Sequence, residues 1–223
     1  MIYAHPETSF QLVPPEEKLE ILAESQGSGL VFLGLCLFFF IVTAIGYQFP
    51  WLILSGFLLA PVIYKSASNK AWNKLKAEKM LYYLGARSAC RRFAFSLGAV
   101  DLEPKILFRG YLTETYDPWH EEPITSPVWV ALFNDCVIAI QEKKGGAVLR
   151  FGSILGPKLK VSREDGKVVM KKDIYMQDRF TYTITSDYPV ALTAFGDMLY
   201  SFQKRFEISF GDKKDLTDKN SED

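Results

Sequence analysis

No charged residue interrupts the run GLVFLGLCLFFFIVTAIGYQFPWLILSGFLLAPVIY at positions 29–64. As a helix, its first part, residues 29–47, would extend roughly 28 Å, close to the hydrocarbon thickness of a bilayer. Its second part, residues 49–64, would extend roughly 24 Å. Because the turn between the two parts is only a few residues long, the helices must be antiparallel. The run therefore predicts a transmembrane helical hairpin over residues 29–64.

The flanks of this run agree with a bilayer interface. Tyr47 and Trp51 fall at the hairpin turn and Tyr64 at the exit, where aromatic rings prefer to lie. A buried hairpin in a soluble core is the alternative, but core helices keep a polar face and this run shows none. A signal peptide fits poorly, because residues 1–28 form an acidic segment and the apolar run is far too long.

Residues 65–98 follow as a basic, amphipathic connecting helix. Positive residues flank this side of the hairpin and the turn carries no charge, so both termini and the soluble domain are expected on the cytoplasmic or topologically equivalent side. Basic residues beside a membrane attract anionic lipid, worth about 1 kcal/mol each. The alternative is that these charges only fix the topology and solvate the helix. The lipid-headgroup candidates are Lys70, Lys74, Lys76, Lys79, Arg87, Arg91 and Arg92.

From residue 105 the pattern changes to short strands separated by turn signals. An apolar stripe at helical spacing then follows Pro189, and it predicts an amphipathic closing helix. Residues 211–223 are polar and are predicted to be a disordered tail. The predicted strands are 105–112, 128–133, 136–141, 147–151, 159–161, 167–171 and 179–185, with a polar loop at 113–126. The apolar stripe consists of Leu192, Phe195, Leu199, Phe202 and Phe206.

This order of elements over residues 103–208 resembles a pleckstrin-homology (PH) domain. Gly110-Tyr111-Leu112 looks like the opening of the family's first strand, and Leu132-Phe133-Asn134-Asp135 is similar to the centre of its second hairpin. The resemblance implies an α+β fold in which a small antiparallel β-barrel or sandwich is closed by the C-terminal helix. Such domains serve as platforms for lipid or protein contacts.

The loop between the first two predicted strands departs from the lipid-binding members of that family. It carries carboxylates and no Lys or Arg, so it would repel a phosphorylated headgroup. We therefore expect protein contacts there instead. Trp119 is either an exposed anchor for a partner or packs back onto the barrel. The partner-binding candidates are Glu114, Asp117, Trp119, Glu121 and Glu122.

The remaining sequence carries no convincing catalytic set. Lys plus Arg and Asp plus Glu both number 26, which argues against a nucleic-acid partner. Cys36, Cys90 and Cys136 form no metal motif, and His120 beside two glutamates fits a solvated surface histidine better than a base. We expect no cofactor, no metal and no enzymatic activity. The predicted function is a membrane-anchored adaptor or accessory subunit that contacts lipids and other proteins of a membrane complex; the alternative is a module that senses anionic lipid.

Overall fold

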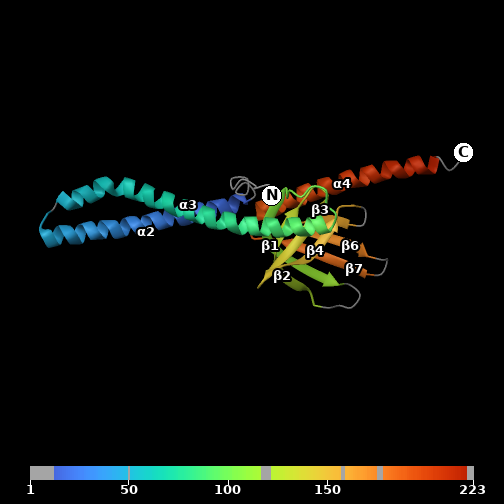
Figure 1. The fold of residues 1–223 in the computed structure, drawn as a ribbon, viewed down its shortest axis with the longest axis horizontal. Helices are drawn as coiled ribbons and strands as arrows, with labels where there is room; N and C mark the ends of the chain where they lie inside the picture. Colours follow the sequence, from blue (N-terminus) through green and yellow to red (C-terminus); the bar gives the residue numbers. More distant parts are fainter. Residues whose placement is uncertain (1–12, 50, 117–121, 157–158, 175–177, 220–223) are drawn as a thin grey trace. The chain divides into compact units, whose positions relative to one another are not determined.

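The computed structural model describes residues 13–49, 51–116, 122–156, 159–174 and 178–219. Two helices come first, α2 (Pro15–Tyr47) and α3 (Trp51–Ser96), and the described strands β1 to β7 and the helix α4 (Pro189–Lys219) follow (Figure 1). The chain divides into two compact units, one of residues 15–82 and one that begins at Tyr83. Each unit is described by itself.

Helix α2 begins well before the apolar run. Pro15 suits the first helical position, and Glu16 and Glu17 in the first turn favour the positive end of the helix dipole. Residues 15–28 of the predicted acidic segment 1–28 are helical and form the first turns of α2. The sequence analysis assigned no secondary structure to that segment.

Helices α2 and α3 are antiparallel, as predicted. A Cβ at Gly29 would overlap the side chain of Ser68 and lie 3.2 Å from the ring of Tyr64, and a Cβ at Gly56 would lie 3.0 Å from the ring of Phe40. As positions in α2 move forward, their neighbours in α3 move backward. The two glycines therefore allow the helices to pack closely at two levels of the hairpin.

Both helices are long and apolar enough to cross a membrane by length and composition. Only 11% and 6% of their most apolar windows are buried within the chain. The core helix of a soluble protein is mostly buried, whereas these two helices leave most of their apolar residues at least partly exposed within the chain. The exposed apolar residues of the hairpin include Leu30, Val31, Phe32, Leu35, Phe38, Phe39, Leu54, Phe57, Leu58 and Val62.

Helix α3 continues without interruption through the predicted connecting segment. The sequence analysis treated residues 65–98 as a separate helix, but α3 is one element of 46 residues that includes Pro61. The change in composition near residue 65 marks a change of surroundings rather than an end of the helix. Gly98, with φ of 83°, is where the helix ends.

The seven described strands form one antiparallel sheet in the order β4-β3-β2-β1-β7-β6-β5. All seven predicted strands are present. The predicted loop 113–126 is shorter than expected, because β1 and β2 continue pairing as far as Glu114 and Ile124. The strands are β1 (Ile106–Tyr116), β2 (Ile124–Leu132), β3 (Cys136–Lys143), β4 (Gly146–Ile154), β5 (Leu159–Glu164), β6 (Lys167–Ile174) and β7 (Asp178–Thr185).

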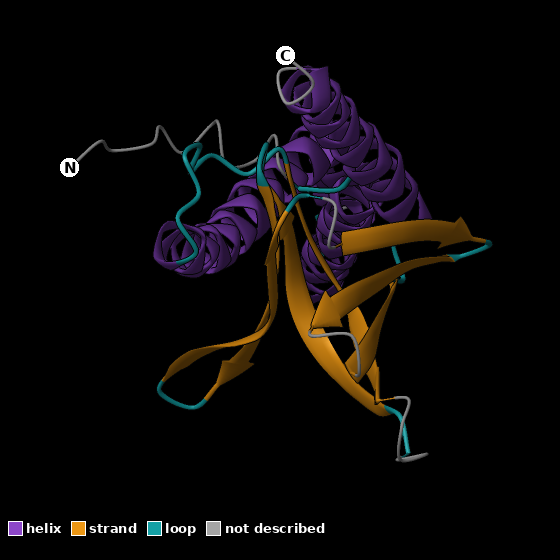
Figure 2. Cartoon of the chain, turned by 90° about the vertical axis from the view of Figure 1, so that its right-hand side faces the viewer, coloured by secondary structure: helices purple, strands orange, loops and turns teal. Residues whose placement is uncertain are grey.

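The sheet is strongly bent, as Figure 2 shows with its strands in orange. Strand β4 does not pair with β7, yet the rings of Phe151 and Tyr182 lie 4.4 Å apart between centroids. The two halves of the sheet therefore face each other across one core. Its largest fully buried side chains include Phe108, Leu112, Leu132, Met170 and Phe195.

Strands β2 and β3 are buried on both faces. Val130 faces the core inside the bend, while its neighbour Trp129 on the outer face is also only 2% exposed. The last turns of α3 cover that outer face: the Tyr83 ring meets the Trp129 ring edge-on at 4.8 Å. Double-sided burial explains why these strands read as continuous apolar runs rather than alternating ones.

Helix α4 closes the core. The Ser186 hydroxyl accepts a hydrogen bond from the Tyr188 amide at 3.1 Å and donates one to the Arg109 carbonyl at 2.7 Å, which fixes the start of the helix on β1. Phe195 meets Phe108 at 5.5 Å. The helix continues to Lys219, through residues that the sequence analysis assigned to a disordered tail over 211–223. No proline interrupts residues 190–219, so the backbone can remain helical without an apolar stripe.

Candidate interaction surfaces

The basic residues of α3 do not form one free surface. Lys79 pairs with the fully buried Glu17 of α2 at 2.5 Å, so its charge stabilises the hairpin. Lys74 makes only a loose contact of 3.9 Å with the exposed Glu78, and Lys70 is exposed. Lys76 is half-buried and has contacts of its own. Lys70 and Lys74 are therefore the lysines best placed to meet an external anion.

The distance of each lysine along the axis of α3 further limits which of these lysines could reach lipid headgroups. For a helix that leaves a bilayer upright at Tyr64, Lys70 lies roughly 9 Å and Lys79 roughly 22 Å further along the axis. The headgroup layer is about 5–7 Å thick on each side, and charges are screened beyond about 8 Å. In that geometry Lys70 would lie within reach of lipid headgroups and Lys79 would not.

The three arginines near the end of α3 differ from one another. Arg87 is buried and forms an ion pair with Glu103, and both burial and the charge of Arg91 lower its pKa. Arg87 is therefore less accessible to an external headgroup than the other candidates. Arg91 is half-buried and Arg92 is exposed.

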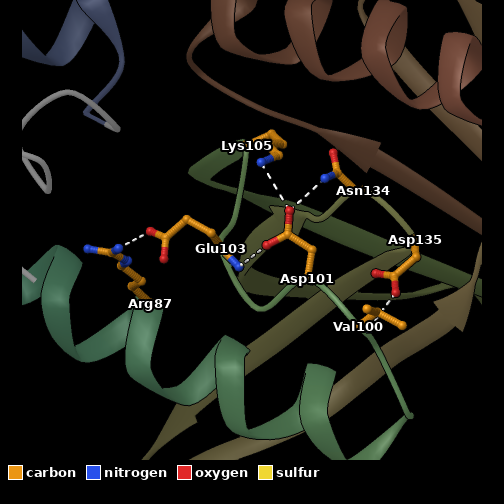
Figure 3. Close-up of polar contacts among 7 residues, drawn as sticks. All are labelled: Arg87, Val100, Asp101, Glu103, Lys105, Asn134 and Asp135. Carbon is orange, nitrogen blue, oxygen red and sulfur yellow. Dashed lines mark hydrogen bonds and ion pairs between the residues drawn. The ribbon is translucent and has the colours of Figure 1, made fainter. Parts of the chain in front are cut away.

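Arg87 belongs to a polar network that ties the end of α3 to the sheet (Figure 3). The carboxylate of Asp101 accepts hydrogen bonds from the Glu103 amide and the Asn134 side chain and pairs with Lys105 at 3.1 Å. The Asp135 carboxylate accepts a hydrogen bond from the Val100 amide at 2.6 Å. The segment between α3 and β1 is therefore held against the β2–β3 turn, whose Asn134-Asp135 pair the sequence analysis took only as a hairpin signal.

The partner-binding candidates predicted for the acidic loop lie in different parts of the structure. Glu114 does not belong to a loop: it lies in β1, about a quarter exposed, and the guanidinium Nε of Arg150 donates to it at 2.9 Å. Its carboxylate is paired within the chain, which makes Glu114 less available to a partner than an unpaired carboxylate would be. Glu122 is exposed just before β2. Asp117, Trp119 and Glu121 lie outside the described residues.

The cluster around Glu114 was not foreseen from the sequence. Residues Ala139 and Ile140 of β3 pair with Phe151 and Leu149, so Arg150 is the extra residue of a β-bulge. A bulge changes the direction of a side chain, and here it lets Arg150 reach Glu114. Burial raises the pKa of the nearby Tyr182, which Glu114 raises further and Arg150 lowers. An arginine within the otherwise apolar run at 147–151 was the one available signal.

The described residues offer little that could perform chemistry. Among them, no group of three or more His, Cys, Asp or Glu side chains is arranged to hold a metal ion. Burial raises the pKa of Cys90 and of Cys136 to about 12, which keeps both thiols protonated and unreactive. His5 and His120 lie outside the described residues.

The strand order, the bend and the closing helix define the class: a PH-like domain that follows two long apolar helices. No family model and no curated protein matches the sequence. Among solved structures, the pleckstrin homology domain of ArhGAP27 is 12% identical, with a TM-score of 0.34 over 44% of this chain and 96% of that one. The DH/PH domains of PDZ-RhoGEF, solved with activated RhoA, are 13% identical, with a TM-score of 0.37 over 69% of this chain and 46% of that one.

Proposed function

We propose that this chain is a membrane-anchored, non-enzymatic adaptor or accessory subunit of a larger membrane complex. The observation that carries the proposal is how little of the two apolar helices the chain itself buries: only 11% and 6% of their most apolar windows. Such surfaces are stable only in lipid or against other membrane helices. The proposal gives the PH-like unit the role of contacting proteins or lipids, a role that its fold suits.

The orientation follows from the flanking charges. Lys65, Lys70 and Lys74 leave the apolar part of α3 together, while the turn at Gln48 is uncharged. Positive residues stay on the cytoplasmic side. The PH-like domain is then presented on the cytoplasmic or topologically equivalent face, where a partner can reach it.

Sensing of anionic lipid by the basic segment is the second candidate, and the exposure of Lys70 and Lys74 favours it. Lys79 and Arg87, which pair with Glu17 and Glu103, weaken it, because fewer free cations remain. In nanodiscs, replacing Lys70 and Lys74 by glutamate should abolish any enrichment of anionic lipid around the protein. Enrichment that persists would exclude this candidate.

The proposed function is tested by affinity purification of the tagged full chain in a mild detergent. We expect a stoichiometric set of membrane proteins to accompany it. A variant with Leu35 and Phe39 of α2 replaced by alanine should release the membrane partners if those helices dock in the bilayer. A chain that remains alone across several detergents would contradict a role as a subunit.

A further inference from the structure

Three exposed apolar side chains surround the end of α3 in the PH-like unit. Phe95 is 72% exposed, Val100 is 93% exposed and Ile154 is 43% exposed. Ile154 lies two residues beyond Gly152, whose position Leu97 covers on the outer face of the sheet. Together with the neighbouring arginines they form what we call the helix-end patch, which consists of Arg91, Arg92, Phe95, Val100 and Ile154.

The backbone that carries the patch is fixed. The Ala99 amide donates to the Ala94 carbonyl and the Gly98 amide to the Phe95 carbonyl, both at 3.0 Å, and Gly98 has φ of 83°. These are the bonds of a Schellman cap. The hydrogen bond from the Val100 amide to Asp135 extends this order beyond the helix (Figure 3). A partner that binds the patch would therefore have little backbone to order, which favours affinity.

The two arginines of the patch are the cations there that no carboxylate neutralises. Among the described residues, neither Arg91 nor Arg92 forms an ion pair, whereas Arg87 pairs with Glu103 and Lys105 with Asp101. The charge of Arg91 also adds to burial in lowering the pKa of Arg87. The nearby carboxylates of Asp101, Glu103 and Asp135 are engaged with Lys105, Arg87 and the Val100 amide, so Arg91 and Arg92 are left to bind carboxylates from outside.

We propose that the helix-end patch binds an acidic segment of a protein partner, with carboxylates on Arg91 and Arg92 and an apolar side chain against Phe95 and Val100. Arginine forms bidentate bonds with carboxylates, and arginine and aromatic residues are enriched in protein interfaces. A surface that binds anionic lipid uses clusters of about four to eight cations. The patch offers two, so a protein segment fits better than an anionic membrane.

This inference rests on the proposed function and names the surface through which the adaptor holds a soluble partner. The test places photoreactive p-benzoylphenylalanine at position 95 of the full chain in its membrane. A matched probe at Tyr200 of α4, which is 58% exposed, reports on non-specific contact. Charge reversal of Arg91 and Arg92 to glutamate is compared with reversal of Lys143 and Lys144, an exposed cation pair in the β3–β4 turn.

We expect the probe at position 95 to cross-link to a co-purifying protein at a segment that contains Asp or Glu beside apolar residues. Reversal of the two arginines should lower the cross-linked yield about tenfold, as loss of charge-assisted bonds predicts, and reversal of the two lysines should leave it unchanged. Cross-links to lipid alone, equal cross-linking from Tyr200, or equal loss in both reversals would overturn the inference. If partners co-purify but position 95 does not cross-link, the inference alone fails. If nothing co-purifies, the proposed function fails with it.

Discussion

Gly29 shows how a single missing side chain sets the packing of the hairpin. Leucine there would have to displace Ser68 and Tyr64 of α3. We expect Gly29→Leu to destabilise the hairpin by about 1–3 kcal/mol, the usual cost of overpacking. The midpoint of unfolding in an SDS titration measures this. Gly34→Leu is the matched control, because nothing lies within 4 Å of its Cβ. Equal effects of both substitutions would contradict the proposed packing.

Cys90 and Cys136 make the stability of the PH-like unit sensitive to high pH. Burial raises both thiol pKa values from 9.0 to about 12, so the folded chain retains protons that the unfolded chain releases. Their contribution to stability is complete below pH 9 and is lost as the pH rises toward 12. Melting temperatures measured between pH 8 and pH 11 should fall, and fall less in a Cys90→Ala/Cys136→Ala variant. Both thiols should also resist alkylation at pH 8 in the folded chain. Rapid labelling would show that they are accessible.

Individual residues were harder to predict from the sequence than the strands that contain them. Glu114 reads as part of an acidic loop because its neighbours in the sequence are polar, but its position opposite Ile124 in β1 and the bulge at Arg150 decide its contacts. Those contacts join residues far apart in the chain. Local composition contains no information about such long-range contacts. The strand β7, from Phe180 to Thr185, shows the opposite case: its alternating pattern depends only on residues adjacent in the sequence, and the strand was predicted correctly.

At the scale of elements, the bulge in β4 and the end of β1 form a link between strands that do not pair. Arg150→Met should therefore cost about 1–2 kcal/mol, more than Arg163→Met, whose ion pair with Asp197 is half exposed on each side. Thermal unfolding of the two variants makes the comparison. If the Arg150–Glu114 pair contributes no more than the exposed pair, the two variants will have the same melting temperature.

The ion pair between Glu114 and Arg150 predicts that removing one or the other charge shifts the pKa of Tyr182 in opposite directions. Glu114 raises the pKa of its phenol and Arg150 lowers it, so Glu114→Gln should lower the tyrosine pKa and Arg150→Met should raise it. Titration of isotope-labelled tyrosine by NMR follows the one resonance. An unchanged tyrosine pKa in both variants would mean that burial alone governs it, and shifts in the same direction would contradict the assigned roles of the two charges.

The helices show where composition misleads. The apolar run at 29–64 was visible at once, but the ends of α2 and α3 lie outside it, in charged sequence that also suits solvated segments. Continuity of a helix depends on backbone compatibility rather than on hydrophobicity, and Pro61 did not end α3. Predicting the helices from their apolar part alone therefore placed their boundaries too close together.

At the scale of the whole molecule, the PH-like unit includes more of the chain than the resemblance suggested. The sequence placed the domain at 103–208, yet Tyr83, Cys90 and Ala94 of α3 are buried and Trp129 on the outer face is covered. We expect a fragment of residues 83–223 to be monomeric and to melt cooperatively. A fragment of residues 103–223 should expose that face, bind a hydrophobic dye and aggregate. Equal behaviour of the two fragments would show that α3 is not part of the fold.

The antiparallel hairpin also fixes which parts of the chain share a side of the membrane. If both apolar helices cross fully, tags at the two termini must lie on one side and Gln48 on the other, because an even number of crossings returns the chain. In the proposed orientation, the basic flank at Lys65, Lys70 and Lys74 would place the tags on the cytoplasmic side. Protease added to sealed inverted vesicles should remove both tags and the PH-like domain, while a label at Gln48 stays protected. Removal of one tag alone would mean that only one helix crosses.

Because residues 51–64 span roughly 20 Å, short of a bilayer core of about 30 Å, full crossing by α3 requires local thinning or a few residues beyond Tyr64 in the membrane. Lys65 can tolerate that depth by extending its ammonium toward the headgroups. Lys70 would then lie nearer the lipid headgroups. We therefore expect replacement of Lys70 by glutamate to disturb the orientation most.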